Sequence, residues 1–262
     1  MINFSPKSRY NFEDLLEIMR ILRSEEGCPW DREQTHETIR MNFLEEAYEA
    51  AEAIDCKDPD MLCEELGDVL LQVVFHARME EENGGFTMND VADGICKKLI
   101  LRHPHIFGEV KVKDSAEVLR NWDKIKQKEK GQRSQSDAIE AVAKSLPALM
   151  RAQKIQAKAA KVGFDWPDVS GAMDKTAEEM CELSSAISDG EGYEEELGDL
   201  LFSCVNIARF LHIDAERALE KSCDKFALRF KKVEEAAEKQ GKLLKDMSLS
   251  EMDKLWDEVK KL

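Results

Sequence analysis

The sequence has few residues that break helices and no segment that suits a membrane. Its 262 residues include only 13 Gly and 6 Pro, fewer than β-rich or low-complexity proteins contain. No apolar run approaches the length that crosses a bilayer, and no basic, apolar leader opens the chain. Hydrophobic residues make up 43% and charged residues 35%. We therefore expect a helical, globular, cytoplasmic protein that has no membrane partner.

Two further absences narrow the class of protein. None of the seven cysteines belongs to a C-x-x-C pair, so we expect buried free thiols in a reducing compartment and no disulfide or zinc framework. The chain also lacks the glycine-rich phosphate loops G-x-x-x-x-G-K-[ST] and G-x-G-x-x-G. Any phosphate chemistry must then use other groups.

Positive charge is scarce as well. The chain has 38 Lys and Arg against 54 Asp and Glu, which gives a net charge of −16. This charge repels nucleic acid and anionic lipid, so we expect neither as a partner. An anionic substrate is compatible with this net charge only if individual residues at its binding site offset the repulsion.

Four sequence segments occur twice in the same order, at an offset of about 130 residues. The pairs are 64–71 with 195–202, 45–49 with 178–182, 98–102 with 225–229, and 122–126 with 256–260. An ordered match of this kind predicts two tandem copies of one domain. We place the first copy at 1–128 and the second at 139–262, with a polar linker at 129–138.

The apolar periodicity within each copy is that of a helical hairpin. In the first copy, apolar residues recur every three to five positions from Ile39 to Ile54 and again from Leu62 to Ala77. The short connection between them contains Pro59, so the helices should run antiparallel, with further helices near 90–102 and 115–128. We predict an all-α fold of two helical-hairpin, four-helix-bundle-type domains. Because a lone hairpin buries little surface, each bundle should be completed across a domain or subunit interface.

Acidic residues on these hairpins are spaced so that four of them should meet. Residues three apart share a helix face, and the antiparallel partner helix brings a second such pair alongside. The first copy would combine Glu46, Glu49, Glu65 and Asp68, and the second Glu179, Glu182, Glu196 and Asp199. A single E-x-x-E motif is usually solvated surface, but the construction occurs twice here.

Repulsion between these carboxylates favours a bound cation. Two unit charges about 5 Å apart repel by roughly 3 kcal/mol at an effective dielectric near 20, which is large beside a domain stability of about 5–15 kcal/mol. The cluster has no His or Cys ligand, and all-oxygen coordination selects Mg²⁺ first and Mn²⁺ second. Such a site typically serves phosphate chemistry.

Cationic, aromatic and amide side chains accompany the clusters and are candidates to bind a nucleotide. Lys175 lies one turn before Glu179, and the cationic and aromatic pairs recur in both copies. Solvated helix surface, or packing within the bundle for the tryptophans, is an equally open interpretation. The set comprises Lys175, Asn206, Lys225, Arg229 and Trp256 in the second copy, and Lys98, Arg102 and Trp122 in the first.

Taken together, these motifs resemble the MazG family of nucleoside triphosphate pyrophosphohydrolases in its long two-domain form. The acidic pattern E-E-x-x-E followed by E-x-x-D carries the resemblance, and four more blocks extend it over nearly the whole chain. These blocks lie at 28–31, 102–107, 145–149 and 162–166.

The resemblance implies Mg²⁺-dependent hydrolysis of nucleoside triphosphates to monophosphate and pyrophosphate by a homodimer with a broad substrate range, for nucleotide-pool control or house-cleaning. It assigns metal binding to the second acidic set and nucleotide contacts to Lys225, Arg229 and Trp256. Asn42 replaces Lys175 in the first copy. We therefore expect turnover in the second copy and a weaker or structural role for the first.

Catalysis would depend on Lys175, Glu178, Glu179 and Glu182. A water should attack the α-phosphorus, and either Glu178 or Glu179 would orient or deprotonate it. Two alternatives stay open. One is a narrower enzyme selective for dUTP or dCTP, and the other is a non-catalytic helical scaffold that binds Mg²⁺ structurally.

Overall fold

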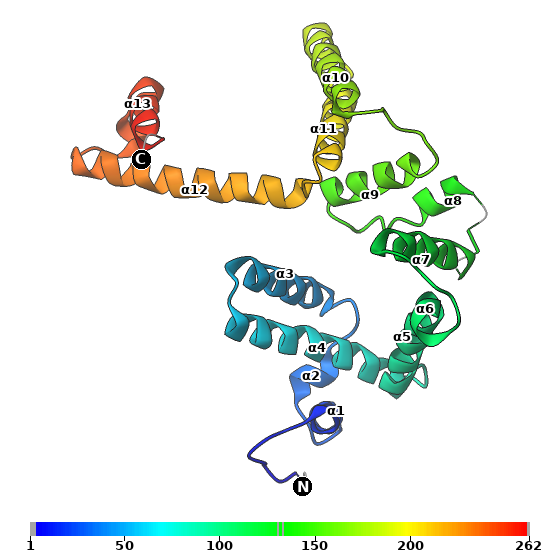
Figure 1. Ribbon diagram of the computed structural model, residues 1–262. Coiled ribbons are helices and arrows are strands. Elements are labelled where there is room, and N and C mark those ends of the chain that lie inside the picture. The colour runs from blue at the N-terminus through cyan, green and yellow to red at the C-terminus, as the bar shows by residue number, and fades with distance from the viewer. Residues whose placement is uncertain (1–3, 130, 133, 261–262) are drawn as a thin grey trace. The chain divides into compact units, whose positions relative to one another are not determined.

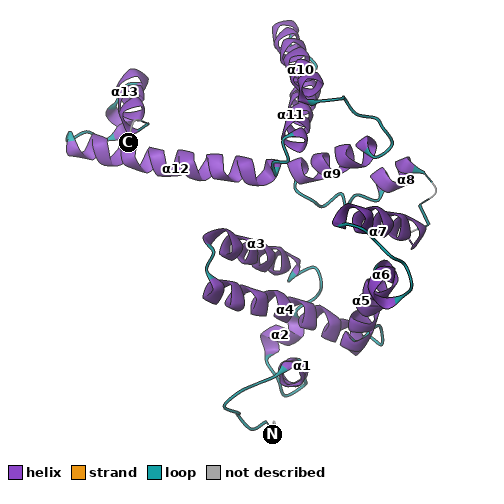
Figure 2. Ribbon diagram, viewed as in Figure 1, coloured by secondary structure: helices purple, strands orange, loops and turns teal. Residues whose placement is uncertain are grey.

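The protein is all-helical throughout the described part of the chain, as predicted (Figures 1 and 2). The computed structural model describes residues 4–129, 131–132 and 134–260. Among these residues, no helix has the length and apolar character needed to cross a bilayer. The chain divides into two compact units, Met1–Ile125 and Lys126–Leu262.

The first unit is built on a long hairpin. Its elements are α1 (Phe12–Leu22), α2 (Pro29–Glu33), α3 (Arg40–Cys56), α4 (Pro59–Glu82), α5 (Met88–Arg102), α6 (Pro104–Phe107) and the greater part of α7 (Ser115–Glu129). Helix occupies five of the ten positions of the predicted 129–138 linker, because α7 continues to Glu129 and the next helix begins at Gln135. Lys130 and Arg133, which also fall in that linker, lie outside the described residues, and the linker stays a prediction.

The second unit repeats the hairpin and adds a long helix. Its elements are α8 (Gln135–Glu140), α9 (Ala148–Ala160), α10 (Val169–Asp189), α11 (Tyr193–Phe210), α12 (Ala215–Lys239), the short 3₁₀ helix η1 (Leu244–Asp246) and α13 (Leu249–Val259). Helices α10 and α11 form the second hairpin. Helix α12 leaves the α9–α11 part, and α13 packs back on it near its C-terminal end (Figure 1).

Local sequence explains both hairpin turns. Lys57 ends α3 in the left-handed region with φ of 56°. The Asp58 side chain then accepts hydrogen bonds from the backbone N–H groups of Asp60 and Met61, and Pro59 occupies the first turn of α4. In the second unit, Gly190 and Gly192 take positive φ values of 81° and 76°, which glycine adopts without a Cβ penalty.

Each unit has a compact apolar cluster away from the acidic end of its hairpin. In the first unit, α1, the residue before α3 and the C-terminal half of α4 pack through Met19, Ile39, Val74, Phe75 and Met79. In the second, α12, the residue after η1 and α13 pack through Val233, Ala237, Met247, Leu255 and Val259. These clusters hold α4 and α12 in place.

Apolar residues beside the acidic clusters of both hairpins are exposed in the single chain. Leu66 of α4 is 53% exposed, and Leu197, at the equivalent position of α11, is 47% exposed. Leu70 and Leu201, one turn further along, are also exposed. Uncovered apolar surface that recurs at matching positions is typical of a surface that another element or chain covers.

The expectation that the cysteines are buried is wrong. All seven are free, but Cys28 is only partly buried and the other six are exposed. These six lie on helix faces that no other described element covers. Apolar periodicity places residues on the inner stripe of a helix, and these cysteines fall outside the regions that pack.

The α12–α13 cluster provides a stability test on one helix. Leu255 of α13 is 4% exposed and Leu249 of the same helix is 72% exposed. We expect Leu255→Ala to lower the free energy of unfolding by about 2–5 kcal/mol, because it leaves a cavity. The matched Leu249→Ala should change it by less than about 0.5 kcal/mol. Urea unfolding of both variants measures this difference, and equal losses would contradict the described packing of α13.

Candidate metal centre

Three carboxylates meet in the second hairpin. Glu179 comes from α10, and Glu196 and Asp199 come from α11. One oxygen of each lies within 4.8 Å of the others. The spacing of three residues puts Glu196 and Asp199 on one face of α11, and the antiparallel turn at Gly190 brings Glu179 against them. The sequence-predicted convergence of these three acids is therefore present in the fold.

Glu179 is the most buried member of this cluster, with 5% of the residue exposed. Its Oε1 accepts an ion-paired hydrogen bond of 2.7 Å from Lys175 Nζ. Its Oε2 is buried and has no hydrogen-bond partner among the described residues. A buried carboxylate oxygen without a donor is unfavourable unless a cation binds it. The all-oxygen donor set and this open oxygen both fit a hard divalent cation.

Lys175 joins the cluster to Glu178. Its Nζ lies 2.8 Å from Glu178 Oε1. Hydrogen bonds to Glu178 and then to Glu179 raise the pKa of Lys175 well above its usual range. The lysine therefore acts as an internal counter-ion, one helical turn from the carboxylate whose other oxygen is open.

Glu182 lies beside the cluster and outside the group of three. Burial raises the pKa of its carboxyl. Lys175 opposes this shift, and Glu179, Glu178 and Glu196 add to it. The second hairpin thus holds three carboxylates within coordination distance of one another and a fourth that is electrostatically coupled to them.

The first hairpin has a parallel cluster with a different membership. Oxygens of Glu46, Glu49 and Glu65 lie within 4.8 Å of one another. Asp68 is the adjoining fourth acid: burial raises the pKa of Glu46, and the charge of Asp68 raises it further. Burial, followed by the charges of Glu49 and Glu64, also raises the pKa of Glu65.

The two clusters differ in internal cation. Lys175 stands four residues before Glu179, whereas Asn42 stands four residues before Glu46. An asparagine carries no charge, so the first cluster has no counterpart of the Lys175–Glu179 ion pair. In the first hairpin, burial and then neighbouring acids raise the pKa of Glu46 and Glu65, which marks these two carboxylates as costly to ionise.

Three of the predicted nucleotide contacts of the second copy lie on α12 and α13, and Asn206 lies on α11. Lys225 is exposed and Arg229 partly exposed, one turn apart on α12. The Trp256 ring lies 5.1 Å from the Phe226 ring, centroid to centroid, and borders the α12–α13 cluster. These contacts agree with the interpretation that Trp256 packs within its own bundle.

In the first copy, the corresponding residues contact each other. The Arg102 guanidinium lies over the Trp122 ring, 5.1 Å from its centroid, which is cation–π geometry. Lys98 is exposed one turn earlier on α5.

A network that the sequence analysis did not identify surrounds Asn206. This residue is 9% exposed, and its Oδ1 accepts a hydrogen bond of 2.9 Å from Arg209 Nε. Arg209 also binds Asp165 through two bonds of 2.9 Å and 2.5 Å. Asp165 and Arg209 stand 44 positions apart, so no local pattern predicts that they interact. The 162–166 block, which contains Asp165, is the sequence feature that points to this network.

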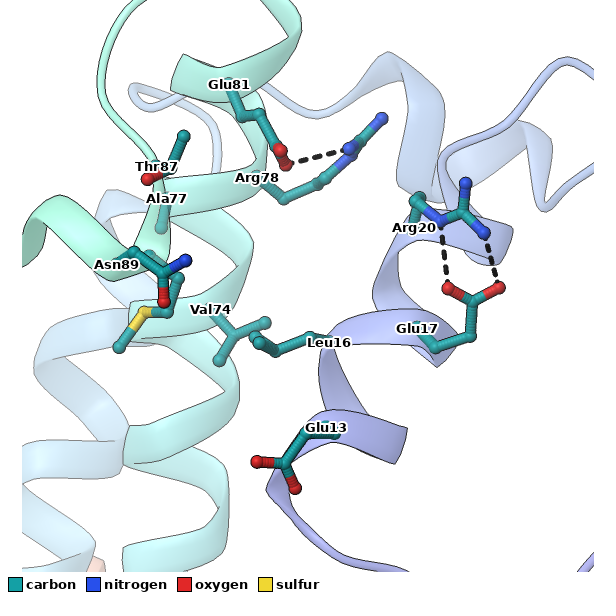
Figure 3. A pocket seen from close by; sticks show the side chains of 11 residues that line it. Glu13, Leu16, Glu17, Arg20, Val74, Ala77, Arg78, Glu81, Thr87 and Asn89 are labelled. Carbon is teal, nitrogen blue, oxygen red and sulfur yellow. Dashed lines mark hydrogen bonds and ion pairs between the residues drawn. The ribbon is translucent and has the colours of Figure 1, made fainter. Parts of the chain in front are cut away.

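A cavity of about 240 Å³ in the first unit is distinct from these sites (Figure 3). It lies between α1, α4 and the start of α5. Its two arginines are each paired on their own helix, Arg20 with Glu17 and Arg78 with Glu81. Its lining holds three glutamates and two arginines, so its net charge is negative and does not favour an anionic ligand.

Comparison with known proteins identifies the two regions of the chain that contain the hairpins. The sequence pattern of the MazG nucleotide pyrophosphohydrolase domain matches residues 34–107 and 169–234, which contain both hairpins. The chain is 49% identical over 249 residues to the nucleoside triphosphate pyrophosphohydrolase/pyrophosphatase MazG of Thermotoga maritima, covering 95% of each chain.

A second relative is similar over the same length. The nucleoside triphosphate pyrophosphohydrolase of Escherichia coli K12 is 47% identical over 252 residues, covering 94% of this chain and 96% of that protein. The uncharacterized protein YabN of Bacillus subtilis is 50% identical over 254 residues, 96% of this chain and 52% of that protein. With two matching domains and full-length relatives at this identity, the chain belongs to the MazG nucleotide pyrophosphohydrolase family.

Proposed function

We propose that this protein hydrolyses nucleoside triphosphates to monophosphates and pyrophosphate, with Mg²⁺ bound in the second hairpin. The observation that carries the proposal is the convergence of Glu179, Glu196 and Asp199, with a buried oxygen of Glu179 left open. The printed names of the Thermotoga and Escherichia relatives support the same reaction. Mn²⁺ is the expected substitute, because it shares the preference for oxygen ligands.

Glu179, Glu182, Glu196 and Asp199 would hold the metal. When bound, Mg²⁺ supplies charge neutralisation for the phosphates and lowers the pKa of a bound water. The chain would provide the remaining functions: it orients the triphosphate, accepts the proton of the attacking water and balances the charge of the leaving group.

Lys175 would change its interaction partner from a carboxylate to a phosphate. In the metal-free site it neutralises Glu179 at 2.7 Å. A divalent cation would take over that neutralisation, which frees the ammonium group to bind a phosphate oxygen. Lys175 would then stabilise the negative charge that develops on the departing pyrophosphate.

Glu178 is the proton acceptor that this exchange favours. Its side chain is 57% exposed, against 7% for Glu179, and the departure of Lys175 leaves its carboxylate free. Glu178 would take one proton from the attacking water. The water oxygen then bonds to the α-phosphorus, and the bond from that phosphorus to the bridging oxygen breaks. Pyrophosphate leaves with the electron pair.

We further propose that the enzyme is a homodimer. The exposed leucines at matching positions of α4 and α11 supply apolar surface for completing each bundle. Lys225, Arg229 and Trp256 would bind the nucleotide, whereas Lys98, Arg102 and Trp122 would serve a weaker or structural first copy. Seven free cysteines, six of them exposed, suit a reducing compartment such as the cytoplasm.

Broad use of nucleoside triphosphates, in pool control or house-cleaning, is the form of the activity that we favour, since the relatives' names specify no base. A dUTP- or dCTP-selective enzyme and a structural Mg²⁺ scaffold are the alternatives. The net charge of −16 argues against nucleic acid as a partner. Pyrophosphate release measured with each of the eight standard triphosphates distinguishes the broad enzyme from the dUTP- or dCTP-selective one. If no triphosphate releases pyrophosphate, the structural Mg²⁺ scaffold is the remaining interpretation.

The acidic cluster of the second hairpin gives the direct test of this proposal. With Mg²⁺ and ATP, we expect the wild-type protein to release pyrophosphate and AMP. The combined Glu179→Gln and Glu182→Gln variant should lose activity by about a hundredfold or more, since it removes metal ligands. Release of orthophosphate without pyrophosphate, or full activity of the double variant, would contradict the proposal.

The first hairpin supplies the matched control for that variant. Combined Glu46→Gln and Glu49→Gln changes the equivalent two positions, and most of the activity should remain. A loss as large as in the second hairpin would show that the first copy also contributes to turnover.

Lys175 should affect metal binding and catalysis in opposite directions. Lys175→Gln removes a charge-assisted contact to phosphate, and we expect kcat/KM to fall about tenfold to a hundredfold. The same change removes the internal competitor of the cation, so the Mg²⁺ concentration that half-stabilises the protein should decrease. Thermal melts at graded Mg²⁺, alongside steady-state kinetics, measure both effects.

Asn42→Lys is the reciprocal control in the first hairpin. It introduces a competitor for the cation, so stabilisation should then require more Mg²⁺. If both variants shift the Mg²⁺ requirement in the same direction, the lysine is not an internal counter-ion.

The raised pKa values predict how pH changes the effect of metal. Burial, followed by neighbouring acids, raises the pKa of Glu46 and Glu65, so the metal-free folded protein holds these protons more tightly than the unfolded chain. Their contribution to stability is therefore fully present below the unfolded pKa, near 4.3, and is lost as pH rises through the folded pKa.

Mg²⁺ should consequently raise the melting temperature more at pH 7.5 than near pH 4.5, where protons compete with the metal for Glu46 and Glu65. Melting curves with Mg²⁺ or with EDTA at each pH test this. The Glu46→Gln and Glu65→Gln variant should show a smaller pH dependence. A Mg²⁺ effect that is equal at both pH values would contradict the assignment.

A further inference from the structure

The orientation of the Asn206 amide is fixed by chemistry. A guanidinium group has hydrogen-bond donors and no acceptor, so Arg209 Nε can only face the carbonyl oxygen of Asn206, at 2.9 Å. Arg209 is itself held by the two bonds to Asp165. The Asn206 NH₂ group therefore points away from Arg209, and Asn206 offers a ligand a donor and not an acceptor.

Asn206 lies on the catalytic face of α11. It follows Asp199 by seven residues, two helical turns or roughly 10.5 Å along the axis. Because α10 and α11 are antiparallel, moving toward Asn206 on α11 means moving toward the N-terminus of α10. Lys175 lies in that direction from Glu179. Lys175 and Asn206 thus lie on the same side of the carboxylate cluster.

The loop that carries Asp165 is fitted closely to this end of the hairpin. Trp166 packs on the first turn of α10, where a Cβ on Gly171 would lie 2.3 Å from the indole Cδ1. Next to Asp165, Phe164 is 83% exposed. The loop therefore places aromatic side chains and the Asp165–Arg209 pair at the end of the hairpin beyond Lys175.

The first copy lacks this arrangement, although it keeps the arginine. At the offset of 131 that aligns Glu64 with Glu195, Phe75 occupies the position of Asn206 and Arg78 that of Arg209. Phe75 is buried in the apolar cluster, and Arg78 pairs with Glu81 and Glu82 on its own helix. The arginine alone is thus not enough to build the network, which is specific to the second copy.

Resting on the proposed function, we propose that Arg209 and Asp165 are positioning residues that fix Asn206 as a hydrogen-bond donor to the nucleoside part of the substrate. The carboxylates, with their metal, and Lys175 account for the phosphates. The groups beyond Lys175 then meet the nucleoside. A fixed donor pairs with a base carbonyl, a ring nitrogen or a sugar oxygen and discriminates against an amino group at the same place.

Kinetics of three variants test the proposal. Without Arg209, the Asn206 amide is free to rotate, so Arg209→Gln should raise KM for ATP about three- to tenfold, the effect of one neutral hydrogen bond, and leave kcat nearly unchanged. Asn206→Ala should raise KM by a similar factor. Because Arg209 acts through Asn206, the double variant should have the KM of Asn206→Ala alone.

Controls separate positioning from simple stabilisation. Arg209→Lys keeps one donor and should fall between wild type and Arg209→Gln in KM. Arg78→Gln removes the equivalent arginine of the first copy and should leave KM unchanged. If Arg209→Gln does not fold, Asp165→Asn, which loosens the guanidinium and leaves Arg209 in place, should raise KM in the same way.

Three outcomes would overturn the proposal while leaving the proposed function intact. They are an unchanged KM in folded Arg209→Gln, multiplicative KM increases in the double variant, and a fall in kcat alone. If the wild-type protein released no pyrophosphate, the proposed function itself would fail, and this result is read before any variant is compared.

Discussion

Repulsion between carboxylates is the constraint on which the rest of this structure depends. Each hairpin brings three acids within 4.8 Å and a fourth beside them. At such distances each pair of charges costs roughly 3 kcal/mol at an effective dielectric near 20. The burial of Glu179 adds a desolvation cost. The clusters are compatible with a stable fold only if protons, an internal cation or a bound metal reduces the charge.

The two copies reduce that charge by different means. In the second, Lys175 lies 2.7 Å from Glu179 and neutralises the most buried acid without metal. In the first, Asn42 offers no charge, and burial together with neighbouring acids raises the pKa of Glu46 and Glu65. Burial raises the pKa of Glu182 in the second copy as well. On the proposed function, metal would displace protons in the first copy, whereas in the second it would also displace the Lys175 ammonium group, which would then be available to a phosphate. The Asn42–Lys175 difference is therefore one of the features that distinguish the two copies.

Local patterns in the sequence predicted much of the fold and the acidic part of the site. Apolar residues at helical spacing indicated α3 and α4, and Asp58–Pro59 indicated the turn between them. The spacing of three residues between Glu196 and Asp199 indicated the carboxylate cluster. These features depend on residues close in sequence, or on one antiparallel turn, so that the helix geometry alone brings them together.

Features that depend on distant segments were not predictable in this way. Asp165 and Arg209 are 44 positions apart, and neither belongs to a periodic pattern. Trp256 allowed two interpretations because its partner Phe226 lies on another helix, α12, whose course no local signal defines. The cysteines were misjudged for a related reason. Burial depends on which helix faces pack, and a sequence pattern shows the stripe that can be buried but not the surface that remains uncovered.

The net charge of −16 has a different meaning once its positions are known. Eight of the acids stand in or beside two clusters, and Lys175 opposes the charge of the second. Charges farther than about 8 Å from a ligand are largely screened at physiological ionic strength. A triphosphate bound with metal would therefore respond mainly to Lys175 and the neutralised cluster. A long polyanion would also meet the acidic surface around it. On the proposed function, the same excess of acid would permit a small anion at a metal-lined site and disfavour nucleic acid, because a small anion contacts only the site whereas a long polyanion extends over the acidic surface.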